Sequence, residues 1–206
     1  MSRLVVTSIG PASSVQDGGR PGSQRYGLVP SGAMDRLALA AANVLVGNPP
    51  FTASIEIGPF GASLTARDGA VRVALSGAVR DADIAKRPVA FDTSVTLADG
   101  ESLTLGFARG GSFSYLAIEG GVQGEPMFGS LAVNARAGLG SPYPRPLQAG
   151  DQLQVADASG AAERRINLPA LADGPISTAA VNGAFPISVL AAASASRSIA
   201  PLGTSP

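Results

Sequence analysis

The chain has 206 residues, no net formal charge and a charged-residue content of 15%. Its length allows a sizeable hydrophobic core, and its balanced charge gives no indication of binding to nucleic acid or an anionic membrane. Cysteine and histidine are absent, which excludes disulfides, Cys/His zinc sites and Ser–His or Cys–His nucleophile pairs. Any proton transfer by this chain would rest on Asp, Glu, Tyr, Lys or water.

The composition favours many short elements over a few long helices. Glycine (26) and proline (16) are abundant, and both residues mark turns and loops. No stretch approaches the roughly 18 consecutive apolar residues of a transmembrane helix, and residues 1–6 lack the apolar core of a secretory signal. We therefore expect a cytoplasmic protein that binds neither membrane nor nucleic acid.

The first quarter of the chain predicts a strand, a long loop and a helix. Residues 4–7 form a short run rich in β-branched side chains, which predicts a first strand. Residues 10–32 are glycine-rich and aperiodic, which favours a functional loop over a disordered one. A helix is expected at 33–46, with Ser31 as its N-cap and Gly47 closing its C-terminus. Its apolar face is expected to comprise Met34, Leu37, Ala38, Ala41 and Leu45.

From residue 52 onward the pattern is that of short antiparallel strands. Asp99-Gly100, between two alternating runs, is the sharpest hairpin signal. Residues 113–118 form a run with apolar residues on both faces and predict a central strand, and residues 152–155 predict a last one. The fold class is therefore mainly β, a sandwich or barrel with one prominent helix. Alternating runs lie at 53–57, 71–75, 94–97 and 102–107.

The end of the chain differs in composition from the rest. Residues 177–206 are rich in Ala and Ser and low in charge, which is typical of poorly ordered segments. We therefore expect one β domain at residues 1–176, followed by a tail that is not integral to its core.

Three motifs carry a family resemblance. Residues 16–22 read Gln-Asp-Gly-Gly-Arg-Pro-Gly, residues 31–35 read Ser-Gly-Ala-Met-Asp, and residues 42–49 read Ala-Asn-Val-Leu-Val-Gly-Asn-Pro. In this order and spacing they resemble allophanate hydrolase subunit 2, a family also described as KipA-like, as biotin-dependent carboxyltransferase and as the C subunit of 5-oxoprolinase. The resemblance covers roughly residues 3 to 176 and implies a fold similar to cyclophilin-like β-barrels.

The chain departs from the family pattern in three places. The family usually carries an arginine before Tyr115 and an Arg-Ser-Thr run after Gly129-Ser130, where residues 131–133 are Leu-Ala-Val. These departures remove two fork-shaped donors for a carboxylate or phosphate. Family members are also longer, and the match ends near residue 176, so we expect a C-terminally truncated chain.

The resemblance implies that the chain is part of an enzyme. Family members look like one part of an ATP-dependent 5-oxoprolinase that opens the cyclic amide of 5-oxoproline to glutamate, with a KipI-like partner and a third hydrolase-type subunit. The chain has no GxxxxGK[ST] phosphate-binding motif, so ATP is expected elsewhere in the complex. Two alternatives are a carboxyltransferase component acting on urea with carboxybiotin from a partner, and a non-catalytic KipA-like antagonist of a KipI-like protein.

Polar residues of the glycine-rich loop are the first site candidates. Arg20 suits a bidentate contact to an anion such as a substrate carboxylate, or a salt bridge to Asp17 that pins the loop. Asp17 is a candidate catalytic carboxylate that orients Arg20 or accepts a proton, with an Asx turn as the alternative. Gln16 is a candidate for binding a substrate amide or carbonyl, or for satisfying loop backbone groups.

The helix and the strand after it add further candidates. Asp35 is interpreted as a helix N-terminal residue, with a catalytic carboxylate as the alternative. Ser31, four residues earlier, is also a candidate substrate contact. Asn43 is expected to tie a neighbouring loop backbone, with ligand contact as the alternative. Glu56 faces away from its apolar neighbours and is either solvated or a catalytic acid or base.

Gly129-Ser130 is the candidate furthest along the chain. Its backbone N–H groups suit an anion, and a plain turn is the alternative. Catalytic roles are thus considered for Asp17, Asp35 and Glu56, and no metal ligands are expected. Substrate contacts are considered for Gln16, Arg20, Ser31, Asn43, Gly129 and Ser130.

Overall fold

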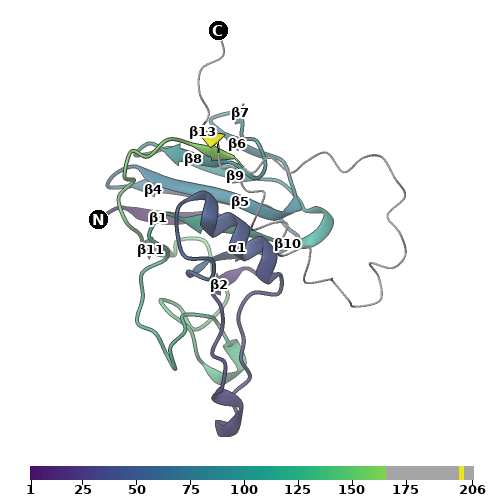
Figure 1. Cartoon of the computed structure of the whole chain (residues 1–206). Helices are drawn as coiled ribbons and strands as arrows, with labels where there is room; N and C mark the ends of the chain where they lie inside the picture. Colours follow the sequence, from purple (N-terminus) through teal and green to yellow (C-terminus); the bar gives the residue numbers. More distant parts are fainter. Residues whose placement is uncertain (166–199, 202–206) are drawn as a thin grey trace.

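The computed structural model describes residues 1–165 and 200–201, which form two antiparallel sheets with one α-helix packed outside them (Figure 1). The strands are β1 (Arg3–Ile9), β2 (Ser14–Gln16), β3 (Ser54–Ile57), β4 (Ala62–Arg67), β5 (Val71–Val79), β6 (Ala82–Ile84), β7 (Arg87–Pro88), β8 (Ser94–Leu97), β9 (Ser102–Leu105), β10 (Arg109–Ile118), β11 (Gln152–Gln154), β12 (Arg164–Arg165) and β13 (Ala200–Pro201). The helices are α1 (Arg36–Leu45) and two short 3-10 turns, η1 (Ser23–Tyr26) and η2 (Ala135–Ala137).

The two sheets confirm the mainly β fold class. One has six strands in the order β11-β1-β4-β9-β6-β7, and the other has five in the order β2-β3-β10-β5-β8. A two-stranded pair, β12-β13, forms a third, small sheet, and β12 lies against the start of β8, where the Arg164 amide donates to the Ser94 hydroxyl at 2.7 Å. The predicted first and last strands correspond to β1 and β11, and the predicted central strand is β10, in the middle of the five-stranded sheet. Among the described residues, no helix is long and apolar enough to cross a membrane.

The main hydrophobic core lies between the two sheets. In β5, Val71, Val73 and Leu75 point into it, whereas the alternate residues face the other side of the sheet. In β3, Ile55 and Ile57 do the same. The sequence alternation thus sorts side chains into an inner layer and an outer layer, and the outer layer of the five-stranded sheet is available to α1.

Helix α1 packs on β5 and β10 and buries a second, smaller core. It is shorter than expected, because Asp35 is the N-cap and its carboxylate accepts from the Leu37 and Ala38 amides at 3.0 Å. The expected cap, Ser31, lies outside the helix with a φ of +56°. The prediction placed the N-terminus too early, since Asp35 offers the same capping chemistry closer to the helix.

The predicted apolar face of the helix is wrong at its start. Met34 and Leu37 are 74% and 53% exposed. Counting the period from Met34, which precedes the helix, rotated the expected face away from the sheet. The helix does end where expected, with Gly47 at a φ of +83°. The residues buried against the sheet include Ala38, Leu39, Ala42 and Leu45.

The hairpin predicted at Asp99-Gly100 is also wrong. The turn exists, since the Glu101 amide donates to the Ala98 carbonyl at 3.0 Å and Gly100 has a φ of +85°. The strands on either side do not pair: β8 joins β5, and β9 lies between β4 and β6 in the other sheet. Turn chemistry specifies the reversal of the chain, and packing decides which strands become neighbours.

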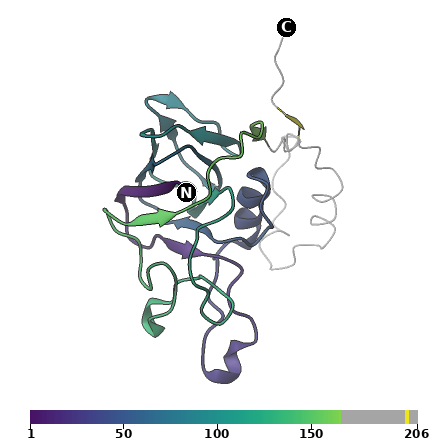
Figure 2. The same ribbon diagram turned by 90° about the vertical axis from the view of Figure 1, so that its left-hand side faces the viewer.

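Two long loops project from the same end of the barrel. The loop carrying η1 and the loop carrying η2 lie together below the sheets in both views (Figures 1 and 2). The Arg20 side chain from the first loop donates to the Ala132 carbonyl in the second at 2.5 Å. Most of the predicted tail at 177–206 lies outside the described residues.

Candidate functional site

Two parts of the glycine-rich loop run side by side and place its polar residues. The Arg20 amide donates to the Pro30 carbonyl at 2.7 Å. At Gly19 the approach is so close that a Cβ atom would lie 2.5 Å from the Ser31 carbonyl oxygen, and φ is +80°. Glycine is therefore required at this position both by space and by backbone conformation, which explains its place in the motif.

Asp17 joins this loop to a turn 113 residues further along the chain. Its Oδ1 accepts from the Gly19 amide and the Ser130 hydroxyl, and its Oδ2 accepts from the Leu131 amide, all at 2.7 Å. The Ser130 hydroxyl in turn accepts from the Ala132 amide at 3.0 Å. The bond to Gly19 is the local capping contact that the sequence suggested, and the other bonds make Asp17 the organiser of the distant turn.

Arg20 is turned inward and is only 1% exposed. Its Nε donates to the Met127 carbonyl at 3.4 Å and its Nη2 to the Ala132 carbonyl at 2.5 Å. Burial lowers the pKa of the guanidinium, and the Asp17 charge opposes that shift. In the described part of the chain no salt bridge joins Arg20 to Asp17, because each group is engaged with the second loop.

Gln16 is buried on β2 and reaches the same second loop. Its Nε2 donates to the Ser14 hydroxyl at 2.9 Å and to the Val133 carbonyl at 3.2 Å. Its Oε1 has no hydrogen-bond partner within the described chain, and neither has Nη1 of Arg20. Buried polar atoms are rarely left unpaired, so this loop junction has hydrogen-bonding capacity that the protein itself does not use.

A pocket of about 270 Å³ lies beside the contact between Asp17 and Ser130. Its walls come mainly from Asp17, from residues 120 and 122–124 and from the turn containing Gly129 and Ser130. The amides of Gly124 and Gly129 make no hydrogen bond to any described residue. None of the residues that line the pocket is cationic. The fold thus brings three of the predicted site residues to one small cavity, with unused backbone donors beside them.

Glu56 belongs to a second cluster, beneath the N-terminus of α1. Its Oε2 accepts from the Met34 amide at 2.9 Å and from the Tyr115 hydroxyl at 2.7 Å, and that hydroxyl accepts from the Asp35 amide at 2.7 Å. Burial raises the pKa of Glu56, while its two hydrogen bonds lower it. Burial and the bond to Glu56 raise the pKa of Tyr115. A solvated Glu56 was therefore a wrong expectation, because the loop before the helix covers that face of β3.

Asp35, Ser31 and Asn43 lie outside the Asp17 pocket. Asp35 caps α1 and contributes to a different cavity of about 350 Å³, next to the bulge at Gly110 and Gly111 in β10. Asn43 is fully buried, and its Nδ2 donates to the Thr52 carbonyl at 2.9 Å. It holds the connection from α1 to β3, the role favoured from sequence.

Two structural residues were missed by sequence reasoning. Arg80 is almost fully buried and donates to backbone carbonyls at one end of the barrel, including that of Gly58 at 2.9 Å, and to the Ser114 hydroxyl at 2.9 Å. Burial lowers the pKa of its guanidinium. Tyr115 was predicted only as part of an apolar strand. The alternation of faces along the strand was the available signal for Tyr115, because it places Tyr115 on the same face of the sheet as Glu56, its partner across β3 and β10.

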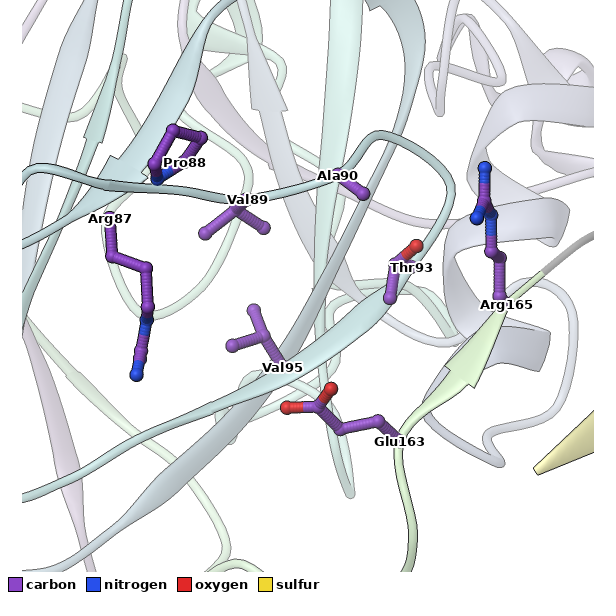
Figure 3. A pocket seen from close by; sticks show the side chains of 8 residues that line it. All are labelled: Arg87, Pro88, Val89, Ala90, Thr93, Val95, Glu163 and Arg165. Carbon is purple, nitrogen blue, oxygen red and sulfur yellow. The ribbon is translucent and has the colours of Figure 1, made fainter. Parts of the chain in front are cut away.

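A third cavity, of about 350 Å³, lies near β7 and β8 (Figure 3). Arg87, Thr93, Glu163 and Arg165 contribute polar groups to it, and Val89 and Val95 form apolar walls. Its residues were not singled out by any sequence motif. It contains positively charged side chains, which the Asp17 pocket lacks.

Comparisons with known proteins agree with this architecture. Residues 26–194 match the family model described as carboxyltransferase domain, subdomain A and B. The chain is 34% identical to the C subunit of 5-oxoprolinase from Haemophilus influenzae over 145 residues, which are 70% of this chain and 47% of that protein. It is also 34% identical to a putative urea carboxylase of Emericella nidulans over 172 residues, 82% of this chain and 14% of that protein.

Solved structures show the same fold. The crystal structure of the protein TTHA0988 superposes with a TM-score of 0.75 and 29% identity over 82% of this chain and 34% of that one. The Kluyveromyces lactis urea carboxylase superposes with a TM-score of 0.71 and 30% identity over 74% of this chain and 14% of that one. The chain spans about half the length of the 5-oxoprolinase relatives that it matches. It belongs to the family of carboxyltransferase domains with subdomains A and B.

Proposed function

We propose that this chain is one subunit of a 5-oxoprolinase, which hydrolyses the cyclic amide of 5-oxoproline to glutamate together with partner subunits. The observation that carries the proposal is the 34% identity to the C subunits of the 5-oxoprolinases from Haemophilus influenzae and Escherichia coli. The pocket beside Asp17 supports it, because motif residues build that pocket.

The chemistry of such a reaction suits the unused donors of this pocket. Hydrolysis adds water across the amide C–N bond, and negative charge develops on the carbonyl oxygen. We propose that the amides of Gly124 and Gly129, which line the pocket and have no hydrogen-bond partner in the described chain, donate to that oxygen. The Asp17 carboxylate also fixes the turn beside the pocket, because it accepts from the hydroxyl of Ser130 and the amide of Leu131.

ATP does not fit the Asp17 pocket. A triphosphate needs cationic groups, and the pocket is lined by a carboxylate and by no cationic residue. We therefore assign ATP to a partner in the complex, either a KipI-like subunit or a third hydrolase-type subunit. In this assignment the chain contributes the amide-binding pocket and a partner contributes the nucleotide site.

The direct test is reconstitution. The chain is mixed with a KipI-like subunit and a third hydrolase-type subunit, and ATP hydrolysis that depends on 5-oxoproline is measured. The proposal expects turnover that falls at least tenfold for Ser130→Ala and is unchanged for Arg87→Ala, which alters the cavity of Figure 3. Partner binding without turnover by a folded chain would favour the non-catalytic KipA-like antagonist.

A second candidate is a carboxyltransferase component that acts on urea with carboxybiotin. It is favoured by the match over 172 residues to a putative urea carboxylase and by the structural similarity to a urea carboxylase. The ureido ring of biotin carries a carbonyl and N–H groups, which the Gly129 amide and Asp17 would hold, and the bound group would supply an activated carboxyl. Bicarbonate- and urea-dependent ATP turnover that avidin inhibits would identify this function.

A further inference from the structure

The electrostatics of the Asp17 pocket limit what it can bind. Asp17 lines the pocket with a negative charge, and the nearest motif cation, Arg20, is buried behind the loop with its Nη1 shielded from solvent. Burial lowers the pKa of Arg20, and the nearby Asp17 charge opposes that shift. A carboxylate in the pocket would therefore meet the negative charge of Asp17 and find no cationic donor among the lining residues.

The hydrogen-bonding groups of the pocket complement an amide instead. The unused amides of Gly124 and Gly129 are donors for a carbonyl oxygen. Asp17 accepts from three donors, and a carboxylate has about four lone-pair positions. The remaining position can accept from a ligand N–H. The pocket thus offers donors for a ligand carbonyl oxygen beside an acceptor for a ligand N–H, which is the pattern that a lactam or a urea requires.

We propose that the Asp17 pocket recognises the uncharged amide of its substrate and rejects carboxylates, so that Asp17 is a specificity-determining residue. This inference rests on the proposed function and refines it. In 5-oxoproline the lactam would enter the pocket, and the carboxylate would point outward to a group elsewhere in the complex. A substrate without a carboxylate, such as urea, would satisfy the pocket equally well.

Three small probes test this on the isolated chain. They are 2-pyrrolidinone, which is the lactam without a carboxylate, 5-oxoproline, which has both groups, and cyclopentanecarboxylate, which has the carboxylate without the amide. Each is titrated while amide chemical shifts are followed by NMR. We expect 2-pyrrolidinone to shift the amides of Gly124, Gly129 and Leu131. We expect 5-oxoproline to bind no more tightly, and cyclopentanecarboxylate to leave these amides unchanged.

The variant Asp17→Asn separates recognition from structural support. Removing the negative charge should favour 5-oxoproline, so the ratio of the two dissociation constants should move at least about threefold in its favour. A purely structural role would weaken both probes together and leave the ratio constant. If Asp17→Asn fails to fold, Ser130→Ala serves instead: it loosens Asp17 and should weaken 2-pyrrolidinone, with Arg87→Ala as the unaffected control.

Two results would overturn the inference: tenfold tighter binding of 5-oxoproline than of 2-pyrrolidinone by the wild-type chain, or no shift of the pocket amides with any probe. Neither result depends on ATP turnover. A reconstituted complex that hydrolyses 5-oxoproline while the probes miss this pocket would leave the proposed function standing and reject the pocket assignment. Probe binding at this pocket without turnover by the reconstituted complex would support the pocket assignment and reject the proposed function.

Discussion

Asp17 and Glu56 are both buried carboxylates, and they differ in what surrounds them. Asp17 accepts from three donors on two loops and borders a pocket. Glu56 accepts from Met34 and Tyr115 beneath a helix, in an environment that raises its pKa. The contrast shows that the role of a buried carboxylate depends on how many hydrogen-bond donors surround it and on whether it borders a cavity.

The largest expected effect concerns the backbone contact that places Asp17. Gly19→Ala would put a Cβ atom 2.5 Å from the Ser31 carbonyl oxygen at a φ of +80°, and we expect a loss of about 3 kcal/mol in unfolding free energy. Gly22→Ala is the matched control, with a φ of +82° and no atom within 4 Å, and should lose about 1 kcal/mol. Urea denaturation measures both, and equal losses would contradict the close approach.

Removing the Asp17 carboxylate is expected to have the next largest effect. Asp17→Ala leaves the Ser130 hydroxyl and the Leu131 amide without their acceptor, which should lower the unfolding free energy by about 2–3 kcal/mol. Asp83→Ala is the control, because that half-buried carboxylate accepts from a single backbone amide. If the two variants unfold at the same urea concentration, Asp17 does not organise the second loop.

In the helix cluster the effect should be smaller. Tyr115→Phe removes the hydroxyl that donates to Glu56 and accepts from the Asp35 amide, with an expected loss of about 1 kcal/mol. It also removes a hydrogen bond that lowers the pKa of Glu56, so that pKa should rise further. Carbon-detected NMR titration of the Glu56 carboxyl measures the shift, and an unchanged titration curve would exclude the proposed coupling.

The smallest effect at any single pH is expected for Glu56→Gln. Because the folded protein holds the Glu56 proton more tightly than the unfolded chain does, the stabilisation from this group is present below pH 4.5 and lost as pH rises through the raised pKa. The glutamine variant has no such loss. Its stability relative to wild type should therefore increase from about pH 4 to about pH 8, as measured by urea denaturation, and parallel profiles would contradict this.

The candidate site was predictable in its parts. The motif containing Gln16, Asp17 and Arg20 and the pair Gly129-Ser130 were visible in the sequence, and the fold joins them. The direction in which Arg20 points was not visible, because its partners are carbonyls more than 100 residues away. A local pattern cannot specify such partners, since any loop brought to that place would offer the same backbone oxygens.

The sequence by itself determined the class of the fold and the family. The alternation of side chains along a strand is a local property, because successive residues point to opposite faces of the sheet. The glycines of the motif are likewise explained locally, by backbone conformations that other residues rarely adopt. The tertiary structure decided which strands pair after Asp99-Gly100, which face of α1 is buried, and whether Glu56 meets solvent. These outcomes depend on which distant segments cover a surface, and burial, unlike local propensity, is a property of the whole packed chain.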